Sequence, residues 1–264
     1  MKSRLDISLH FKNEKTVIKD CFFEQPYKII AVPKLAGQEL LEIIVMCASP
    51  GILSGDELFF NLNLEENCQL KISTQAYQRL FTSELGMFQT LNFRVDKGAT
   101  LVYLPHPVVP HRASVFTSVA EIFLEKNANL IWSEILTPGR TNIEELFSFH
   151  FFQSKILVYQ SEKLVFKDFQ LLEPKYHNLQ ELGLMEGFTH QSILVCIGKF
   201  SDIKAVMTEL EQIFENKIEE LIYGISELHV SGFILRILGK EAEELFIMHR
   251  KAAEYIENSF LKSE

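Results

Sequence analysis

The sequence predicts a mainly β (α+β) protein, built of stacked or helical layers of short β-strands with two C-terminal α-helices. Three observations predict this fold class. Apolar and polar residues alternate from the N-terminus to about residue 200, which is the period of a strand. Within that region a strand–turn–strand pattern repeats about every 30 residues. After residue 200 apolar residues recur every three or four positions, which is the period of a helix face.

The alternating segments read as short strands bounded by turn residues. The first runs from Leu5 to Phe11, where apolar residues alternate with Asp6, Ser8 and His10. Similar segments cover 59–64, 70–72, 91–95, 101–103, 115–119, 122–124, 130–132 and 147–151. The chain also has 22 Phe and one Trp, and aromatic side chains suit a pleated, half-buried surface.

The repeat lies at 64–70, 95–101 and 124–130, where each copy is a strand, an acidic and polar turn, a small residue and a second strand. Asn67, Gly98 and Asn127 occupy the position at which a tight hairpin turn needs a positive φ. Successive copies are 31 and 29 residues apart. This spacing favours layers that cover one another's apolar faces; the alternative is a large β-sandwich with three similar hairpins.

Two helical stripes follow the strands. The first runs from Ile203 to Leu221, with Ser201 or Asp202 as its cap and Gly224 at its end. A strand over 233–238 precedes a second helix over about 240–262. Because no linker rich in Pro, Gly or Ser separates these parts, we expect a single domain over 1–264. Its β-rich body covers 1–200, and a helical and strand-containing part covers 201–264.

The charge balance excludes several classes of protein. The chain has 26 basic and 35 acidic residues, a formal charge of −9, and Arg250–Lys251 is its longest basic cluster. A nucleic-acid-binding protein needs a basic stripe to neutralise phosphates. The most apolar run, 40–48, is nine residues long and contains Glu42, whereas a membrane span needs about 20 apolar residues. We therefore expect no nucleic acid and no membrane as partners, and a cytoplasmic protein.

Familiar catalytic motifs, such as a nucleophile elbow or a P-loop, are missing from the sequence. His106 and His111 are five residues apart in a Pro-rich segment. With no third ligand nearby, ordinary loop histidines are the favoured interpretation over a shared metal. His249 falls on the apolar stripe of the last helix and is expected to be a hydrogen-bonded core residue. Four separated cysteines are expected to be reduced, buried packing residues: Cys21, Cys47, Cys68 and Cys196.

Three carboxylates stand next to apolar strands or turns: Asp56, Glu134 and Asp168. A carboxylate that points into a layered β body must be solvated, paired or close to a cation. One interpretation pairs these carboxylates with Arg79, Arg94 or Arg140. The other is a polar, negatively lined interior that holds or passes a divalent cation.

Six motifs occur along the chain in one order: Ser-Pro-Gly-x-x-x-Gly-Asp (49–56), Thr-Gln-Ala-x-x-Arg (74–79), Leu-x-Tyr-Leu-Pro-x-Pro (101–107), Trp-x-Glu-x-x-x-x-Gly-Arg (132–140), Gly-Phe-Thr-His (187–190) and Ser-x-Leu-x-x-x-Gly-x-x-x-Arg-x-Leu-Gly (226–239). Read together, they resemble the UreD/UreH family of urease accessory proteins. The chain departs from the family's pattern at Ile52 and Leu53, where a glycine-richer turn is common, and at Arg79, where Lys is usual.

The resemblance implies a non-enzymatic scaffold or chaperone in urease maturation. It implies three partners: a UreF-type accessory protein, a UreG-type GTPase and apo-urease. It implies no tightly bound cofactor, but Ni²⁺ in transit through a water-filled passage inside this subunit. Carried onto the matching positions, Asp56, Glu134 and Asp168 are candidate lining residues of that passage. It also implies an exposed apolar surface for the UreF-type partner.

Two other functions fit parts of the sequence. The first is a β-solenoid carbohydrate-active enzyme, in which paired carboxylates such as Asp56 and Glu134 act as acid and base on a glycosidic bond. The second is a purely structural β-solenoid, which the appended helices argue against. Neither accounts for the ordered motifs.

Overall fold

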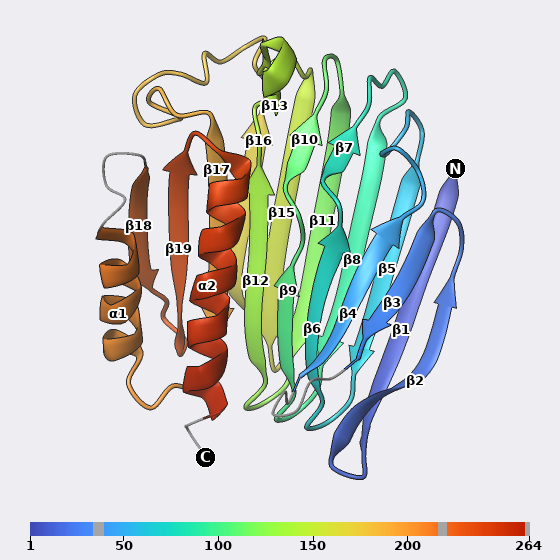
Figure 1. The fold of residues 1–264 in the computed structure, drawn as a ribbon, viewed down its shortest axis with the longest axis vertical. Helices are drawn as coiled ribbons and strands as arrows, with labels where there is room; N and C mark the ends of the chain where they lie inside the picture. Colours follow the sequence, from blue (N-terminus) through green and yellow to red (C-terminus); the bar gives the residue numbers. More distant parts are fainter. Residues whose placement is uncertain (34–39, 216–220, 262–264) are drawn as a thin grey trace.

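The computed structural model describes residues 1–33, 40–215 and 221–261, and most of its strands form two facing sheets. Sheet A contains, in spatial order, β16 (Lys163–Leu172), β15 (Phe151–Gln160), β11 (Val115–Leu124), β8 (Met87–Val95), β5 (Glu57–Leu64), β1 (Lys2–Lys12) and β2 (Lys15–Phe23). Sheet B contains β18 (Ile222–Glu227), β19 (Gly232–Gly239), β17 (His190–Ile197), β12 (Asn129–Leu136), β9 (Thr100–Leu104), β6 (Gln69–Gln75), β4 (Leu41–Cys47) and β3 (Tyr27–Val32). Figure 1 shows sheet B in front of sheet A.

Short elements join these strands at one end of the body. β7 (Gln78–Leu80) and β10 (Val108–Pro110) pair with each other, and β10 also pairs with β12. β13 (Gly139–Arg140) and β14 (Glu145–Leu146) form a separate two-stranded ribbon around the 3-10 helix η1 (Thr141–Ile143). These connections lead the chain from a strand of sheet B back to the next strand of sheet A.

The repeat builds parallel coils. Each of its turns leads from a strand of sheet A to a strand of sheet B: β5 to β6, β8 to β9 and β11 to β12. Within sheet A, β5, β8 and β11 are parallel, and within sheet B, β6, β9 and β12 are parallel. The predicted stacked, helical arrangement of β layers is therefore confirmed, together with its period.

The predicted hairpins at these turns are wrong. Asn67, Gly98 and Asn127 do adopt positive φ angles of 60°, 69° and 60°. Yet the strands on either side of each turn belong to different sheets, so they face each other through side chains and share no hydrogen-bond ladder. The flanking small residues are buried between the sheets: Cys68, Ala99 and Ala128. A left-handed turn residue reverses the chain in a hairpin and also in an arch, which is a turn that joins strands of two facing sheets. Burial of both flanking strands between the sheets selects the arch.

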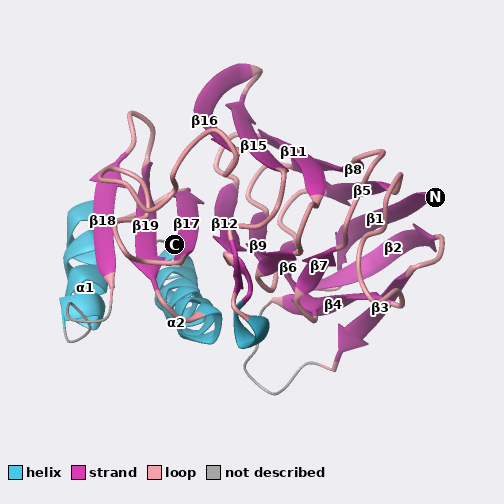
Figure 2. Ribbon diagram, turned by 90° about the horizontal axis from the view of Figure 1, so that it is seen from above, coloured by secondary structure: helices cyan, strands magenta, loops and turns pink. Residues whose placement is uncertain are grey.

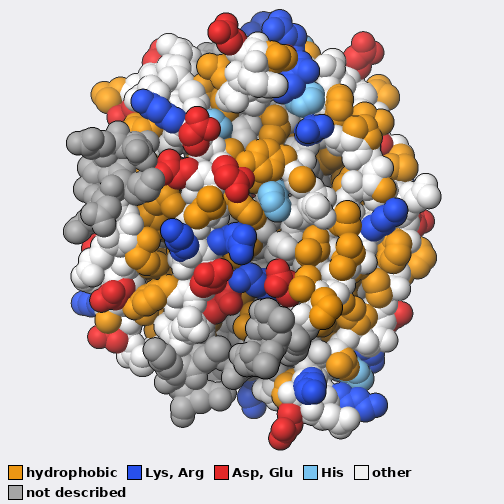
Figure 3. All heavy atoms as spheres, viewed as in Figure 1, with side chains coloured by type: hydrophobic (Ala, Val, Ile, Leu, Met, Phe, Trp, Pro, Cys, Tyr) orange, Lys and Arg blue, Asp and Glu red, His pale blue; other side chains and the backbone are white. Residues whose placement is uncertain are grey.

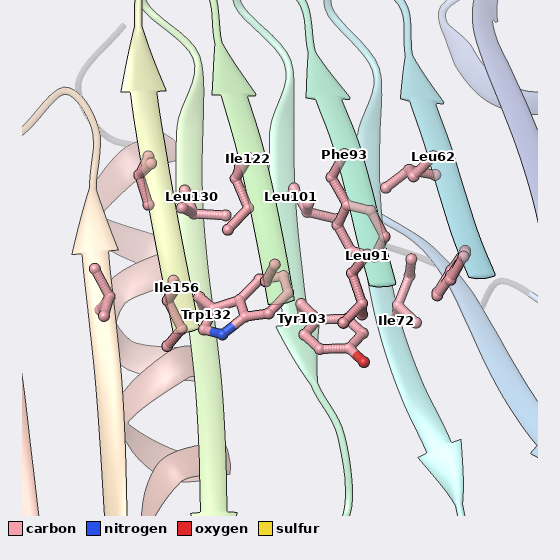
Figure 4. Close-up of a cluster of buried hydrophobic side chains, with 14 of the residues drawn as sticks. Leu62, Ile72, Leu91, Phe93, Leu101, Tyr103, Ile122, Leu130, Trp132 and Ile156 are labelled. Carbon is pink, nitrogen blue, oxygen red and sulfur yellow. The ribbon is translucent and has the colours of Figure 1, made fainter. Parts of the chain in front are cut away.

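Apolar side chains from both sheets fill the space between them, as Figure 4 shows. Phe93 and Ile122 point inward from sheet A, and Leu101 and Trp132 point inward from sheet B. The rings of Trp132 and Tyr103 stack with centroids 4.4 Å apart. This core fixes the separation of the sheets, and strand alternation decides which polar side chains share the interior with it.

Both predicted helices are present. α1 (Ile203–Glu215) begins after Asp202, whose Oδ1 accepts a hydrogen bond from the Ala205 N–H at 3.0 Å. The predicted continuation of this helix over 216–220 lies outside the described residues. Gly224 does not end the helix; it lies in β18, an edge strand that the sequence did not predict. β18 escapes prediction because its apolar residues, Ile222, Tyr223 and Ile225, do not alternate regularly with polar ones.

α2 (Ala242–Leu261) lies across the outer face of sheet B (Figure 1) and packs on β9, β12, β17 and β19. A second core fills this layer, with Leu210 and Phe214 from α1 and Leu245 and Ile256 from α2. His249 is buried here, and its Nδ1 lies 2.7 Å from the Ser133 hydroxyl. Burial lowers the pKa of His249 to about 3, so it is the neutral core histidine that the sequence predicts.

The cysteines are free thiols, as predicted. Cys68 and Cys196 are buried and Cys21 is half-buried, but Cys47 is exposed, so the prediction that all four are buried is wrong. Cys47 ends β4 on the same face as the buried Ile43 and Val45, but it is exposed because it lines an open pocket at the end of the body. Among the described helices, none combines the length and apolar character needed to cross a bilayer.

Replacement of Gly98 tests the turn conformation and the packing of neighbouring turns. Its φ is 69°, and an added Cβ would lie 2.5 Å from the Asn67 Oδ1 atom of the neighbouring turn. We expect Gly98→Val to lower the free energy of unfolding by about 2 kcal/mol or more, because strain and a close contact add. Urea denaturation measures the change. Asn127→Gly, at the equivalent position of the next turn, is the control and should change stability by less than about 1 kcal/mol; equal urea midpoints for both variants would contradict the left-handed conformation at Gly98 and its close contact with the neighbouring turn.

Candidate functional site

Three cavities lie in series between the two sheets. The wide pocket, about 470 Å³, opens among β4, β6 and β7, and its lining includes Cys47, Gly51, Tyr77, Arg79, Tyr103 and Glu243. The middle cavity, about 40 Å³, shares Gln78, Gln89 and Tyr103 with the wide pocket. The edge cavity, also about 40 Å³, shares Val108, Glu134, Ile135 and Phe152 with the middle cavity. Shared walls make these three spaces neighbours along one line.

The mouth of the wide pocket is polar although its walls are largely apolar. The Tyr77 hydroxyl donates to Glu243 Oε2 at 3.1 Å, which ties β6 and its following loop to the start of α2. Burial, with a further contribution from Glu243, raises the pKa of Tyr77 to about 12. Ser49, Pro50, Gly51 and Ile52 of the first motif form part of the wall. An added Cβ on Gly51 would lie 2.4 Å from the Arg79 carbonyl oxygen of β7. Only glycine therefore lets the loop 49–56 approach β7 this closely.

At the junction with the middle cavity, the side chains of the two sheets meet directly. Gln78 Nε2 donates to Gln89 Oε1 at 2.6 Å, and Gln78 belongs to β7 whereas Gln89 belongs to β8. The His106 ring lines the middle cavity and stacks on Phe246, with centroids 4.3 Å apart. The narrowing from the wide pocket to the middle cavity is thus bounded by neutral polar groups.

Glu134 is the central charged group of this line, because it lines both the middle and the edge cavity. It lies two residues after Trp132 on β12, so strand alternation turns its side chain into the space between the sheets. Its carboxylate accepts hydrogen bonds from the Ser154 hydroxyl at 2.7 Å and from Trp132 Nε1 at 3.2 Å. Burial raises the pKa of Glu134, the two hydrogen bonds lower it and the nearby Asp168 charge adds a smaller increase, so that the pKa lies at about 7.

Asp168 lines the edge cavity with Glu134. It lies on β16 of sheet A, and its Oδ1 accepts a hydrogen bond at 2.5 Å from Arg236 Nη2, on β19 of sheet B. Gln191 of β17 also lines the cavity, and its buried Nε2 atom has no hydrogen-bond partner among the described residues. A cavity of this volume has room for water, which would satisfy such groups.

Asp56 is buried at the end of its turn, away from the other two carboxylates. Its Oδ2 accepts from the Leu53 N–H at 2.9 Å and its Oδ1 from the Met1 ammonium group at 3.0 Å. Among the described residues that line the three cavities, Asp56 is absent. Its loop, however, forms part of the wide pocket's wall. The structure therefore brings together Glu134 and Asp168, and it connects Asp56 to the line only through that loop.

The arginine partners suggested by the sequence are wrong. Asp168 pairs with Arg236, and Glu134 is held by a hydroxyl and an indole N–H. Arg140 instead pairs with Glu145 at 2.6 Å, and Arg94 lies over the Phe123 ring. The sequence carried a signal for Arg236, since it is the one charged residue in an otherwise apolar strand and belongs to the last motif.

The structure does not place His106 and His111 in a metal cluster. The His106 ring stacks on Phe246, and the His111 ring lies against Phe81 with centroids 4.8 Å apart. Throughout the described ranges, no group of three or more His, Cys, Asp or Glu side chains lies close enough to hold a metal ion. Any metal that enters the line of cavities would meet at most pairs of carboxylates, together with neutral oxygen and nitrogen atoms.

Comparison with known proteins gives consistent matches over the whole chain. The family described as UreD urease accessory protein matches residues 1–264. Urease accessory protein UreD of Flavobacterium johnsoniae is 35% identical over 252 residues, which cover 95% of this chain and 91% of that protein. UreD of Acetivibrio thermocellus is 33% identical, covering 92% and 93%. Urease accessory protein UreH of Helicobacter pylori is 30% identical, covering 92% and 89%.

The raised pKa of Glu134 predicts a pH-dependent effect of Glu134→Gln on stability. Between the unfolded pKa of 4.5 and the folded value of about 7, the native state binds more protons than the unfolded state, so the wild type loses stability as the pH rises through this window. The variant lacks this loss. We expect the difference in the free energy of unfolding, variant minus wild type, to increase from pH 4.5 upward and to level off above pH 7, about 3 kcal/mol higher than at low pH.

Urea denaturation of both proteins at pH 5, 6, 7 and 8 measures this difference. Glu121→Gln is the control. Glu121 lies on β11 of sheet A and is half-exposed on the outer face of that sheet, away from the cavities. A difference between Glu134→Gln and the wild type that stays constant with pH would show that Glu134 does not titrate in this window.

Proposed function

The chain belongs to the UreD family of urease accessory proteins, which gives it a role in urease maturation, and we propose that it acts as a nickel-conducting scaffold. In this proposal the protein is not an enzyme and keeps no tightly bound cofactor. Together with a UreF-type accessory protein and a UreG-type GTPase, it passes Ni²⁺ in the cytoplasm to apo-urease. The observation that supports the proposal best is the line of three cavities between the sheets, with the buried Glu134 carboxylate at its centre.

The chemistry of the line suits transit more than storage. A divalent cation that leaves bulk water needs oxygen or nitrogen atoms in place of its hydration shell, and conduction requires that each site binds weakly enough to release the ion. The edge cavity offers the carboxylates of Glu134 and Asp168, the amide side chains of Gln170 and Gln191, and room for water. These groups can share a partly hydrated ion, and too few of them converge to trap it.

The three sequence-predicted carboxylates take different parts in this proposal. Glu134 is the obligatory group, since it lines two successive cavities. Asp168 follows it at the edge of the body. Asp56 acts at the wide pocket, where it holds the loop 49–56 in shape through the Leu53 N–H; a direct contact with nickel there is part of the same hypothesis.

Exposed apolar side chains support the existence of docking surfaces for partner proteins. They occur on both edge strands of sheet A, with Val17, Ile18, Phe22 and Phe23 on β2 and with Leu164, Phe169 and Leu171 on β16. On the face seen in Figure 3, acidic and basic side chains are interspersed with apolar ones, and no field of a single sign covers it. Contacts with partners are therefore expected to depend on apolar burial more than on charge.

The alternative of a carbohydrate-active enzyme finds no support in the geometry. Its proposed acid and base, Asp56 and Glu134, line no common cavity in the described part of the chain. Asp56 is also held by a backbone N–H and an ammonium group inside a turn. A glycosidase needs both carboxylates on either side of one bond.

Urease activation tests the proposed passage. Urease and its accessory proteins are co-expressed at limiting Ni²⁺ with this chain as wild type, Glu134→Gln, or Glu134→Gln/Asp168→Asn. We expect urease activity and urease-bound nickel to fall at least tenfold with the double variant, because the passage loses its anionic groups. Glu134→Gln keeps the side chain's shape and is expected to be at least as stable as the wild type, and urea denaturation of the variant separates a loss of activity from misfolding.

The matched control for this test is Glu121→Gln, which removes a carboxylate from the outer face of sheet A and should leave activation unchanged. Full activation with the double variant, at normal levels of the chain in the assembled complex, would disprove a route for nickel past Glu134 and Asp168.

A further inference from the structure

The ion pair between Arg236 and Asp168 closes the edge cavity, and it joins the two sheets. Asp168 comes from β16 of sheet A and Arg236 from β19 of sheet B. Both residues line the cavity that also contains the Glu134 carboxylate. We propose that Arg236 is the gate of this cavity: its guanidinium occupies Asp168 as a built-in cation, and a divalent ion must displace it to bind there. This inference rests on the proposed function and adds how the outlet is controlled.

The exposure of the two side chains shows that the pair can open. The Arg236 side chain is 56% exposed, whereas that of Asp168 is 17% exposed. Because the guanidinium already contacts water, it loses little when it turns outward, and such exposed pairs stabilise a fold only weakly. Asp168, by contrast, stays at the cavity wall through its place on β16. Arg236 is therefore the mobile partner and Asp168 the fixed one.

The groups beneath the gate are those that a cation needs. Gln170 on β16 and Gln191 on β17 line the cavity beside the two carboxylates. With Arg236 turned away, the cavity presents their amide oxygens, the carboxylates of Glu134 and Asp168, and space for water. Such a mixed set of oxygens suits a divalent ion that keeps part of its hydration shell.

The gate also explains how two carboxylates can share one small cavity in the resting protein. Without Arg236, the negative charges of Glu134 and Asp168 would repel each other in a poorly solvated space. The guanidinium balances one of them until a cation arrives. Arg236 and the cation thus exclude each other at Asp168, and the resting cavity holds no strong attraction for stray cations.

Nickel binding to the purified full-length chain tests the gate. Isothermal titration with Ni²⁺ in a non-coordinating buffer is compared for the wild type, Arg236→Gln, Arg236→Lys and Arg236→Gln/Asp168→Asn. We expect Arg236→Gln to bind one Ni²⁺ at least tenfold more tightly than the wild type. Arg236→Lys keeps the positive charge and should resemble the wild type. The double variant should lose the gain, since the unmasked carboxylate is gone.

Arg4→Gln is the matched control. Arg4 is an exposed arginine on β1 of sheet A, and its Nε lies 2.7 Å from the Asp6 carboxylate on the outer face of that sheet. Arg4→Gln changes the net charge by the same amount as Arg236→Gln. Equal Ni²⁺ affinity for Arg236→Gln and the wild type, or an equal gain for Arg4→Gln, would overturn the proposal. So would a gain that persists in the double variant. If Arg236→Gln does not fold, Arg236→Met, which retains the apolar stem, takes its place in the same comparison.

The same variants separate failure of the gate from failure of the passage. If Arg236→Gln leaves nickel affinity unchanged while Glu134→Gln/Asp168→Asn abolishes urease activation, the gate is wrong and the passage stands. If Arg236→Gln tightens nickel binding but the Glu134 and Asp168 variants activate urease fully, the gated site exists and the proposed route does not.

Discussion

Strand alternation between two facing sheets is the constraint on which the rest of the structure depends. Every second residue of a strand points into the interior, so the chain can add a polar group there only at an inward position, and it must then satisfy that group. On β12, this alternation turns Trp132 and Glu134 toward sheet A and turns Ser133 toward α2, where it meets His249. A single strand thus supplies an aromatic wall, a buried carboxylate and a helix contact.

The way in which these polar groups are satisfied distinguishes structure from function. The Ser133–His249 pair lies in a filled layer, and burial there lowers the pKa of His249. Glu134 is held by a hydroxyl and an indole N–H but borders two cavities, and its pKa of about 7 makes the charged form accessible near neutrality. Ser133 and Glu134, which are adjacent on β12 and point to opposite faces, therefore have different roles. The surroundings of Ser133 are dry, whereas those of Glu134 have room for water.

Much of the fold follows from local patterns, while the site depends on contacts that local patterns do not encode. Period-2 alternation, the left-handed turn positions and the two helical stripes predict the strands of the repeat, the coil period and the two helices. They miss β2, β3, β16 and β18, and of the strand predicted over 147–151 only Phe151 lies in a strand. They could not separate hairpins from arches, because a residue such as Asn67 reverses the chain equally in both. Glu134 was recognised as a carboxylate in an apolar strand. Its neighbour Asp168 is paired with Arg236, 68 residues away, and no spacing rule links them.

The open flank at Arg236 follows from where the two sheets end. A stack of parallel coils needs a terminating element on each side, since its last strand would otherwise offer unpaired backbone groups. Sheet A ends with the antiparallel hairpin β15–β16, whereas sheet B continues beyond β12 through β17, β19 and β18. Figure 2 shows β16 curving away at this flank, opposite the extended part of sheet B. Because the extra strands of sheet B have no partner layer of equal width, other groups close the interior there: Leu179 and Met185 from the segment between β16 and β17 pack into the core, and Arg236 and Asp168 form the charged pair across the edge cavity.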